Sequence, residues 1–110
     1  MVKYIPERGD IVWIDFEPKK GREIAKTRPA LVLSPGSYNA KSELALFVPI
    51  TSSIKNYPFE VEIKYNTISG AILCDQIRSM DWRERKAKKI ISLENKLLNE
   101  VLHKIRLILL

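Results

Sequence analysis

The sequence contains one cysteine, Cys74, and one histidine, His103, and this scarcity limits the chemistry available to it. A lone cysteine cannot form an internal disulfide and has no CxxC partner for a metal. Its place in the apolar run Ala71–Cys74 predicts a core position. One histidine also excludes the histidine pair that many ribonucleases use as acid and base, and His103 is expected on a polar surface. Neither a Walker, a Rossmann nor an HExxH motif is present, and four early carboxylates lack the spacing of a metal cluster: Asp10, Asp15, Glu17 and Glu23. We therefore expect no metal and no cofactor.

Long apolar runs are also missing. No run approaches the roughly 20 residues that a transmembrane helix needs, and the opening segment Met1–Tyr4 leads into charged residues and not into the core of a signal peptide. We therefore expect no membrane association and a cytoplasmic location. The length of 110 residues predicts a single domain over residues 1–110, and a hydrophobic fraction of 45% with 29% charged residues is typical of a globular chain.

Positive charge is in excess, with 19 Lys and Arg against 13 Asp and Glu, a net charge of +6. A basic protein attracts polyanions, because phosphates steer it by Coulomb attraction and release condensed counterions on binding. Much of the excess lies in Arg83–Lys89, which could equally be a solvent-exposed loop. Charge alone therefore leaves open whether the partner is RNA or an acidic protein segment.

The first two thirds of the chain has the pattern of short strands. Asp10–Phe16 carries apolar and β-branched residues on both faces, as in a strand buried on both sides, and residues 17–27 read as an exposed loop. Pro29 stands at the start of the next strand, where its missing N–H disturbs a ladder least. Further strands are expected at Ala30–Leu33, Leu44–Ile50, Phe59–Ile63 and Ile68–Ile77, with loops at Ser34–Ser37 and Ser52–Tyr57.

The last segment changes to a helical period. Apolar residues recur from Leu93 to Leu109 at a spacing of three and four, and Ser92 precedes them as a plausible N-cap. The sequence thus predicts a mainly β fold with one C-terminal amphipathic helix. Its last residues, Leu107–Leu110, are too apolar to be left in water, which favours a covered interface.

Two segments carry the most specific signal. Gly21–Pro35 contains a glycine loop with Glu23 and then the pair Arg28-Pro29, and Val48–Ser53 follows downstream with Thr51 at a strand end. This framework resembles that of the MazF/PemK toxins, and the likeness continues in Tyr4–Phe16, Tyr57–Val61 and Asp75–Arg83. The resemblance implies an SH3-like small barrel of antiparallel strands with short helices and a C-terminal amphipathic helix. It also implies a homodimeric endoribonuclease, an mRNA interferase of a type II toxin-antitoxin system.

Residue types in the framework suit RNA cleavage. RNA brings its own nucleophile, the 2′-hydroxyl, so the enzyme must orient it, accept its proton, stabilise charge and protonate the leaving 5′-oxygen. Arg28 offers a planar fork of donors to two phosphate oxygens, and the Thr51 hydroxyl can hold the same phosphate. Glu23 has a pKa low enough to accept a proton near neutrality, although the family resemblance also admits proton transfer by the arginine. Which residue is general base and which general acid stays open. Taken singly, Arg28 could also be a surface ion-pair former and Thr51 a turn cap.

Substrate contacts are expected from polar residues in two later segments. A single-stranded RNA site combines a basic groove with exposed groups that meet bases and backbone. By resemblance these residues are Lys55, Asn56, Tyr57, Asp75, Gln76 and Arg78. Asp75 and Gln76 could read base edges, or could equally serve to hold loop ends or a dimer together.

The resemblance further implies metal- and ribosome-independent cleavage of single-stranded mRNA at short, ACA-like sites, leaving 2′,3′-cyclic phosphate and 5′-hydroxyl ends. It implies a cognate antitoxin whose acidic segment competes for the basic groove. Two alternatives remain: a non-enzymatic gyrase poison of the same fold, and an SH3-like nucleic-acid-binding repressor. The gyrase poisons end in a Trp-Gly-Ile-like tail, whereas this chain ends in Leu107–Leu110.

Overall fold

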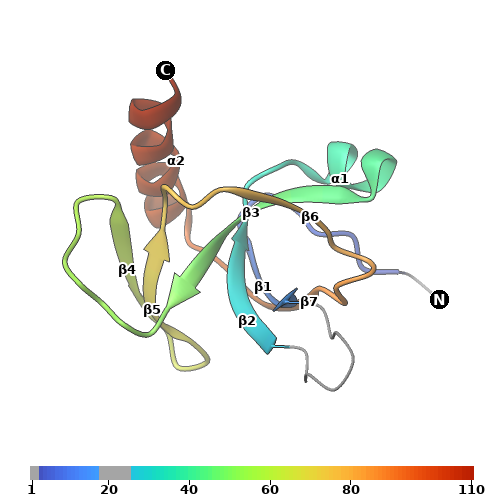
Figure 1. Ribbon diagram of the computed structural model, residues 1–110, viewed down its shortest axis with the longest axis horizontal. Helices are drawn as coiled ribbons and strands as arrows, with labels where there is room; N and C mark the ends of the chain where they lie inside the picture. The colour runs from blue at the N-terminus through green and yellow to red at the C-terminus, as the bar shows by residue number, and fades with distance from the viewer. Residues whose placement is uncertain (1–2, 18–25) are drawn as a thin grey trace.

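The computed structural model describes residues 3–17 and 26–110, and its main element is a curled antiparallel sheet (Figure 1). Two helices accompany the sheet, α1 (Gly36–Ser42) after β2 and α2 (Asn95–Leu109) at the C-terminal end. The strands are β1 (Asp10–Glu17), β2 (Lys26–Val32), β3 (Leu44–Thr51), β4 (Glu60–Lys64), β5 (Ser69–Leu73), β6 (Arg78–Asp81) and β7 (Lys88–Ser92).

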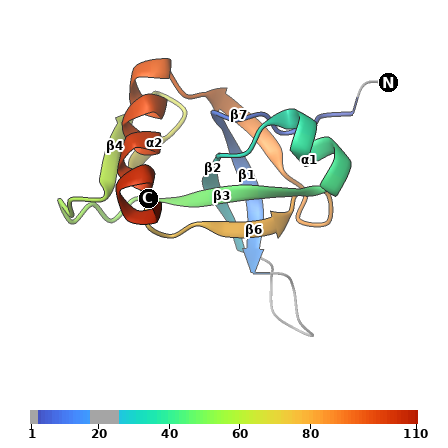
Figure 2. The same cartoon turned by 90° about the horizontal axis from the view of Figure 1, so that it is seen from above.

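Strand β3 connects the two parts of the sheet. The strands follow the order β4-β5-β3-β2-β1-β7, and β6 also pairs with β3. The first half of β3, Leu44–Phe47, pairs with β6, whereas Ile50 and Thr51 at its end pair with Ile72 and Ala71 of β5. The long course of β3 across the molecule is visible in Figure 2. Thr51 therefore lies where β3 meets the β4–β5 part of the sheet.

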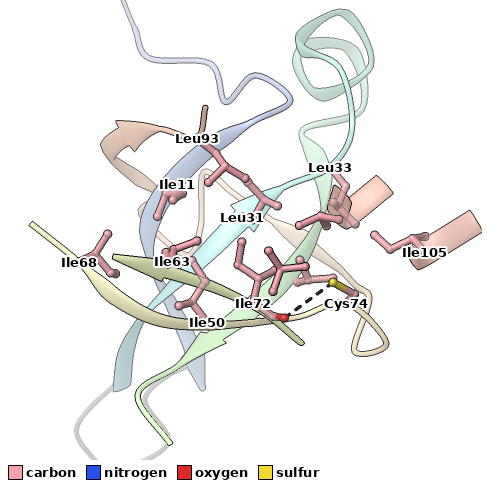
Figure 3. Packing of buried hydrophobic residues seen from close by; sticks show 13 residues of the cluster. Ile11, Leu31, Leu33, Ile50, Ile63, Ile68, Ile72, Cys74, Leu93 and Ile105 are labelled. Carbon is pink, nitrogen blue, oxygen red and sulfur yellow. Dashed lines mark hydrogen bonds between the residues drawn. The ribbon is translucent and has the colours of Figure 1, made fainter. Parts of the chain in front are cut away.

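The main core lies between the sheet and α2. Helix residues Val101 and Ile105 pack against apolar side chains from the strands, including Leu31 and Ile72 (Figure 3). Burial of such side chains supplies the dominant favourable term in folding, because apolar surface leaves water. The apolar face of α2 explains its helical period, since only one stripe of the helix needs to face the sheet.

A second core covers the other face of β1, β2 and β3. Val12, Ile14 and Phe16 of β1 belong to it, whereas Ile11 belongs to the main core. This arrangement accounts for the apolar residues on both faces of β1, because the strand is buried from both sides. Trp13 is the exception and remains 39% exposed.

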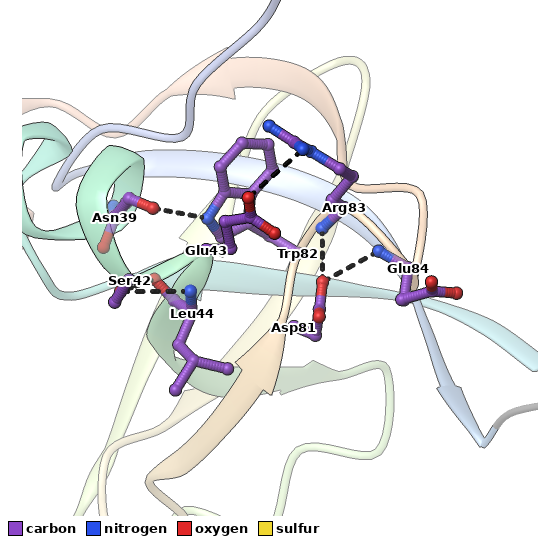
Figure 4. Close-up of polar contacts among 8 residues, drawn as sticks. All are labelled: Asn39, Ser42, Glu43, Leu44, Asp81, Trp82, Arg83 and Glu84. Carbon is purple, nitrogen blue, oxygen red and sulfur yellow. Dashed lines mark hydrogen bonds and ion pairs between the residues drawn. The ribbon is translucent and has the colours of Figure 1, made fainter.

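Helix α1 is fastened to the segment that follows β6 (Figure 4). The indole Nε1 of Trp82 donates a 3.0 Å hydrogen bond to the carbonyl of Asn39, and the Asn39 side chain donates to the carbonyls of Pro6 and Ser34. Arg83 also forms an ion pair of 3.3 Å with Glu43. These contacts hold the N-terminal end of β3 and leave its opposite end, at Thr51, free to form a site.

The predicted fold class is confirmed: the molecule is mainly β, with a curled antiparallel sheet, a short helix and a C-terminal amphipathic helix. Four local predictions were wrong. Strand β2 begins at Lys26 and not at Ala30, so Pro29 lies inside the strand, paired with Trp13, and the predicted loop at residues 17–27 is too long. The segment Ser34–Ser37 was predicted to be a loop, yet α1 begins at Gly36. Ser92 was predicted to cap the C-terminal helix, but it is the last residue of β7 and α2 begins after Glu94. The strand predicted at Ile68–Ile77 is shorter, because β5 ends at Leu73. Part of the basic run is also ordered, since Lys88 and Lys89 lie in β7 and pair with β1. No helix within the described residues is long and apolar enough to cross a membrane.

Candidate active site

Three of the surface cavities have Thr51 as a lining residue. It lines a cavity of about 620 Å³ with Lys55 and Asp75, a second of about 390 Å³ with Trp13, and a smaller one of about 220 Å³ with Arg78. Because these cavities share Thr51 and, in pairs, further lining residues such as Arg28 and Gln76, they lie next to one another at the end of β3. We call the three cavities together the β3-end site.

Arg28 reaches the β3-end site from the neighbouring strand. Ala30 of β2 pairs with Pro49 of β3, and Arg28 and Thr51 each lie two residues beyond this pair on their adjacent strands. Both residues line the second and the smaller cavity. Arg28 is exposed, and in the described part of the chain no carboxylate forms an ion pair with it. Its guanidinium can therefore offer its donors to an anion bound beside Thr51.

The Thr51 hydroxyl has a defined environment. Its Oγ1 accepts a 3.1 Å hydrogen bond from the backbone N–H of Ser53. A hydroxyl that accepts one hydrogen bond still has its own proton to donate. Thr51 can thus donate to a phosphate oxygen while its strand and the Ser53 amide hold its position.

The loop of residues 52–59 forms one wall of the largest cavity. Lys55, Asn56, Tyr57 and Pro58 all line it. The backbone N–H groups of Lys55 and Tyr57 donate to the carboxylate of Glu60, at 3.2 Å each to Oε1. Lys104 of α2 donates a 2.7 Å hydrogen bond to the Pro58 carbonyl. The loop is therefore attached to both β4 and α2.

The turn after β5 forms the opposite wall. Asp75 and Gln76 line the largest cavity, and Gln76 also lines the smaller one with Arg78. The Tyr57 hydroxyl donates a 2.9 Å hydrogen bond to Asp75 Oδ2, which raises the pKa of Tyr57 above its ordinary value. The guanidinium of Arg78 lies 5.2 Å from the centre of the Phe16 ring, a cation–π contact that orients it toward the site.

All of the predicted site residues within the described part of the chain line the β3-end site: Arg28, Thr51, Lys55, Asn56, Tyr57, Asp75, Gln76 and Arg78. Glu23 lies outside the described residues. Glu60 also lines the largest cavity, although the sequence pattern predicted only a strand for its segment, Phe59–Ile63.

One arginine of the basic run after β6 holds the end of β1 in place. Arg85 is half-buried and donates a 3.1 Å hydrogen bond to the Asp15 carbonyl near the end of β1, and another to the Phe16 carbonyl. Arg85 therefore holds the strand that carries Phe16. Within residues 3–17 and 26–110, no group of three or more His, Cys, Asp or Glu side chains is placed to hold a metal ion.

Comparison with known proteins decides the family. Residues 7–109 match the model of the PemK-like, MazF-like toxins of type II toxin-antitoxin systems. The chain belongs to this toxin family. It is similar to the endoribonuclease toxin MazF of Escherichia coli strain K12, with 48% identity over 79% of this chain and 78% of that protein. It is also 32% identical to the endoribonuclease PemK of Escherichia coli, over 94% of this chain and 81% of that protein.

A solved structure supports the same assignment for this MazF/PemK-family chain. The MazE–MazF crystal structure (Form-II) from Deinococcus radiodurans has a TM-score of 0.90 and 42% identity, and covers 97% of each chain. The family relationship also explains why the sequence framework and the fold agree. In this chain the strand order brings β2 and β3 together at the β3-end site.

Proposed function

We propose that this chain is an endoribonuclease that cuts single-stranded RNA at the β3-end site. One observation carries the proposal: Arg28 and Thr51, from adjacent strands, line the same cavities, and the walls of these cavities bear Lys55, Asp75, Gln76 and Arg78. A guanidinium beside a hydroxyl suits a phosphodiester, and the flanking polar groups suit bases and backbone. The names of the curated relatives, endoribonucleases MazF and PemK, support the same activity.

The proposed reaction is an internal transesterification. The 2′-oxygen forms a bond to phosphorus, and the bond from phosphorus to the 5′-oxygen breaks, leaving a 2′,3′-cyclic phosphate and a 5′-hydroxyl. The 2′-hydroxyl proton passes to a base, for which we propose Glu23, and the leaving 5′-oxygen takes its proton from water. Arg28 holds the phosphate oxygens on which negative charge grows, and Thr51 orients the phosphate. These groups need no metal ion for their roles.

We also propose two protein partners. The MazE–MazF structures from Deinococcus radiodurans contain a toxin with its antitoxin, which supports a cognate antitoxin for this chain, with an acidic segment that competes for the basic site. A second copy of the chain would cover the apolar end of α2, where Leu107 and Leu109 are both 64% exposed. A short ACA-like recognition sequence is proposed on family grounds.

The test is RNA cleavage in excess EDTA. Purified wild-type chain is incubated with a long single-stranded RNA beside Arg28→Ala and Thr51→Ala, and every new end is mapped with its phosphate chemistry. Removing one preorganised donor typically costs about 100- to 1000-fold in rate, so Arg28→Ala should nearly abolish cutting. Arg106→Ala is the matched control, because it removes an exposed arginine from α2 that lines none of the three cavities. Intact RNA under folded wild-type protein would overturn the proposal and direct the search toward a protein target.

A further inference from the structure

We propose that Glu60 is a positioning residue that sets RNA recognition by holding the loop of residues 52–59 in its binding shape. The inference rests on the proposed ribonuclease function, because the loop carries the proposed RNA-binding residues Lys55, Asn56 and Tyr57. Glu60 is the first residue of β4, follows this loop directly in the chain and lines the same cavity.

The contacts of Glu60 run to backbone and not to side chains. Its Oε1 accepts hydrogen bonds from the N–H groups of Lys55 and Tyr57, at 3.2 Å each, and its Oε2 lies 3.4 Å from the Lys55 nitrogen. The Glu60 N–H in turn donates to the Tyr57 carbonyl at 3.0 Å. A carboxylate that accepts backbone N–H groups forms charge-assisted hydrogen bonds, and because its partners are backbone groups, it can hold the loop whatever side chains the loop bears.

Asn56 stands between the two donors and has a backbone φ of 57°. Few residues other than glycine adopt this left-handed conformation, and asparagine does so more readily than most. The conformation reverses the chain locally, so that the amides before and after Asn56 both turn toward Glu60. The side chains of Lys55 and Asn56 remain exposed at the cavity. Glu60 thereby orients the groups that would meet RNA.

The backbone of Glu60 is well anchored for this role. It pairs with Leu73 across β4 and β5, and the neighbouring Phe59 carbonyl accepts a 2.9 Å hydrogen bond from the Cys74 N–H. Leu73 and Cys74 lead directly into Asp75, on the opposite wall of the cavity. Glu60 thus ties the loop to the strand that positions the opposite wall.

The negative charge of Glu60 should repel the phosphates of a bound RNA. This repulsion makes it possible to distinguish two roles for Glu60 by experiment. If Glu60 acts only as a charge, then removing the charge should strengthen RNA binding and leave the cut sites unchanged. If it acts by positioning, the loss of its acceptors should loosen the loop, lower kcat at the preferred sequence and spread cutting to other sequences. Binding of nonspecific RNA should not weaken, because a repulsive charge has gone.

The experiment compares three variants of the full chain. Glu60→Ala removes both charge and acceptors, whereas Glu60→Gln removes the charge but keeps an oxygen that can accept from Lys55 and Tyr57. Glu62→Ala is the matched control: Glu62 lies two residues further along β4, on the same face, and its carboxylate pairs with Lys64 at 3.6 Å. The readouts are kcat and KM on the preferred RNA sequence, the distribution of cut sites on a long RNA, and hydrogen exchange of the Lys55 and Tyr57 amides.

The expected result is specific to Glu60→Ala. Its kcat at the preferred sequence should fall by up to about 100-fold, as for other small misplacements near a reacting centre, with KM little changed and the cut sites broadened. The two amides should exchange about 10-fold faster or more, as expected from loss of a charge-assisted hydrogen bond. Glu60→Gln should restore most of the specificity, and Glu62→Ala should match wild type.

Three outcomes would overturn the inference: a folded Glu60→Ala chain with unchanged cut sites and amide exchange, the same broadening in Glu62→Ala, or a Glu60→Gln chain as impaired as Glu60→Ala. The exchange measurement does not depend on catalysis. If wild-type chain leaves RNA intact, the proposed ribonuclease function fails, while the amide exchange still reports whether Glu60 holds the loop.

Discussion

The hydroxyl of Tyr57 donates a 2.9 Å hydrogen bond to Oδ2 of Asp75 and thereby joins the loop after β3 to the turn after β5. These two segments form opposite walls of the largest cavity at the β3-end site. The contact closes one edge of that cavity with a pair of exposed side chains, which RNA could break and replace with contacts of its own.

The Tyr57–Asp75 pair predicts a titration that can be measured. The hydrogen bond to Asp75 raises the pKa of Tyr57, with a smaller contribution from the negative charge of Asp75. Any stability from this pair is present below the ordinary tyrosine pKa of about 10 and is lost as the pH rises through the raised value. In Asp75→Ala, which removes both the acceptor and the charge, the pKa of Tyr57 should fall toward its ordinary value. NMR titration of ring-labelled tyrosine, assigned with Tyr57→Phe, checks this, and an identical curve in both proteins would contradict it.

Thr51 should depend on its hydroxyl and not on its shape. Thr51→Val keeps the β-branch but loses the acceptor for the Ser53 N–H and the proposed donor to phosphate. A lost hydrogen bond to a charged group is worth about 1.5–3 kcal/mol, so kcat should fall about 10- to 100-fold. Thr51→Ser should retain most of the activity. Single-turnover cleavage measures both, and equal rates for the valine variant and wild type would rule out the hydroxyl role.

Gly70 should be required for the position of Thr51. Its φ is +153°, and a Cβ built on it would meet the carbonyl oxygen of Thr51. Gly70→Ala should therefore push β5 away from the end of β3, destabilise the chain by about 1–3 kcal/mol and impair cleavage. Gly36→Ala is the control, because its added Cβ would meet only the flexible end of the Glu7 side chain. Urea unfolding with parallel activity assays tests the pair, and a Gly70→Ala chain as stable and active as wild type would refute it.

Cys74 should be unreactive in the native protein. The thiol is fully buried, and desolvation raises its pKa to about 11. Since only the thiolate reacts, well under about 1% of the thiol is reactive near pH 8. Ellman's reagent should therefore label Cys74 only as urea unfolds the chain, at the same midpoint as the loss of the β-sheet circular dichroism signal. Rapid labelling without urea would show that the thiol is accessible.

Much of the fold could be predicted from local pattern. The two-faced apolar run of β1, the alternation at Phe59–Ile63 and the helical period of α2 each depend on residues close together in the chain, and burial imposes these periods directly. Helix α1 escaped prediction because Gly36–Ser42 lacks a strong apolar stripe and is fixed by distant contacts, with the indole of Trp82 donating to the carbonyl of Asn39.

The candidate site, too, could be predicted from the sequence only in part. Residue types and their order already pointed to Arg28 and Thr51, because a guanidinium and a hydroxyl suit a phosphate wherever the chain brings them together. Only the tertiary structure decided that they share a cavity, since it pairs β2 with β3 close to both residues. It alone revealed Glu60, whose role depends on where its carboxylate meets the amides of Lys55 and Tyr57. Local periodicity and residue chemistry are properties of the sequence, whereas a hydrogen bond between side chain and loop backbone depends on how the folded chain turns back upon itself.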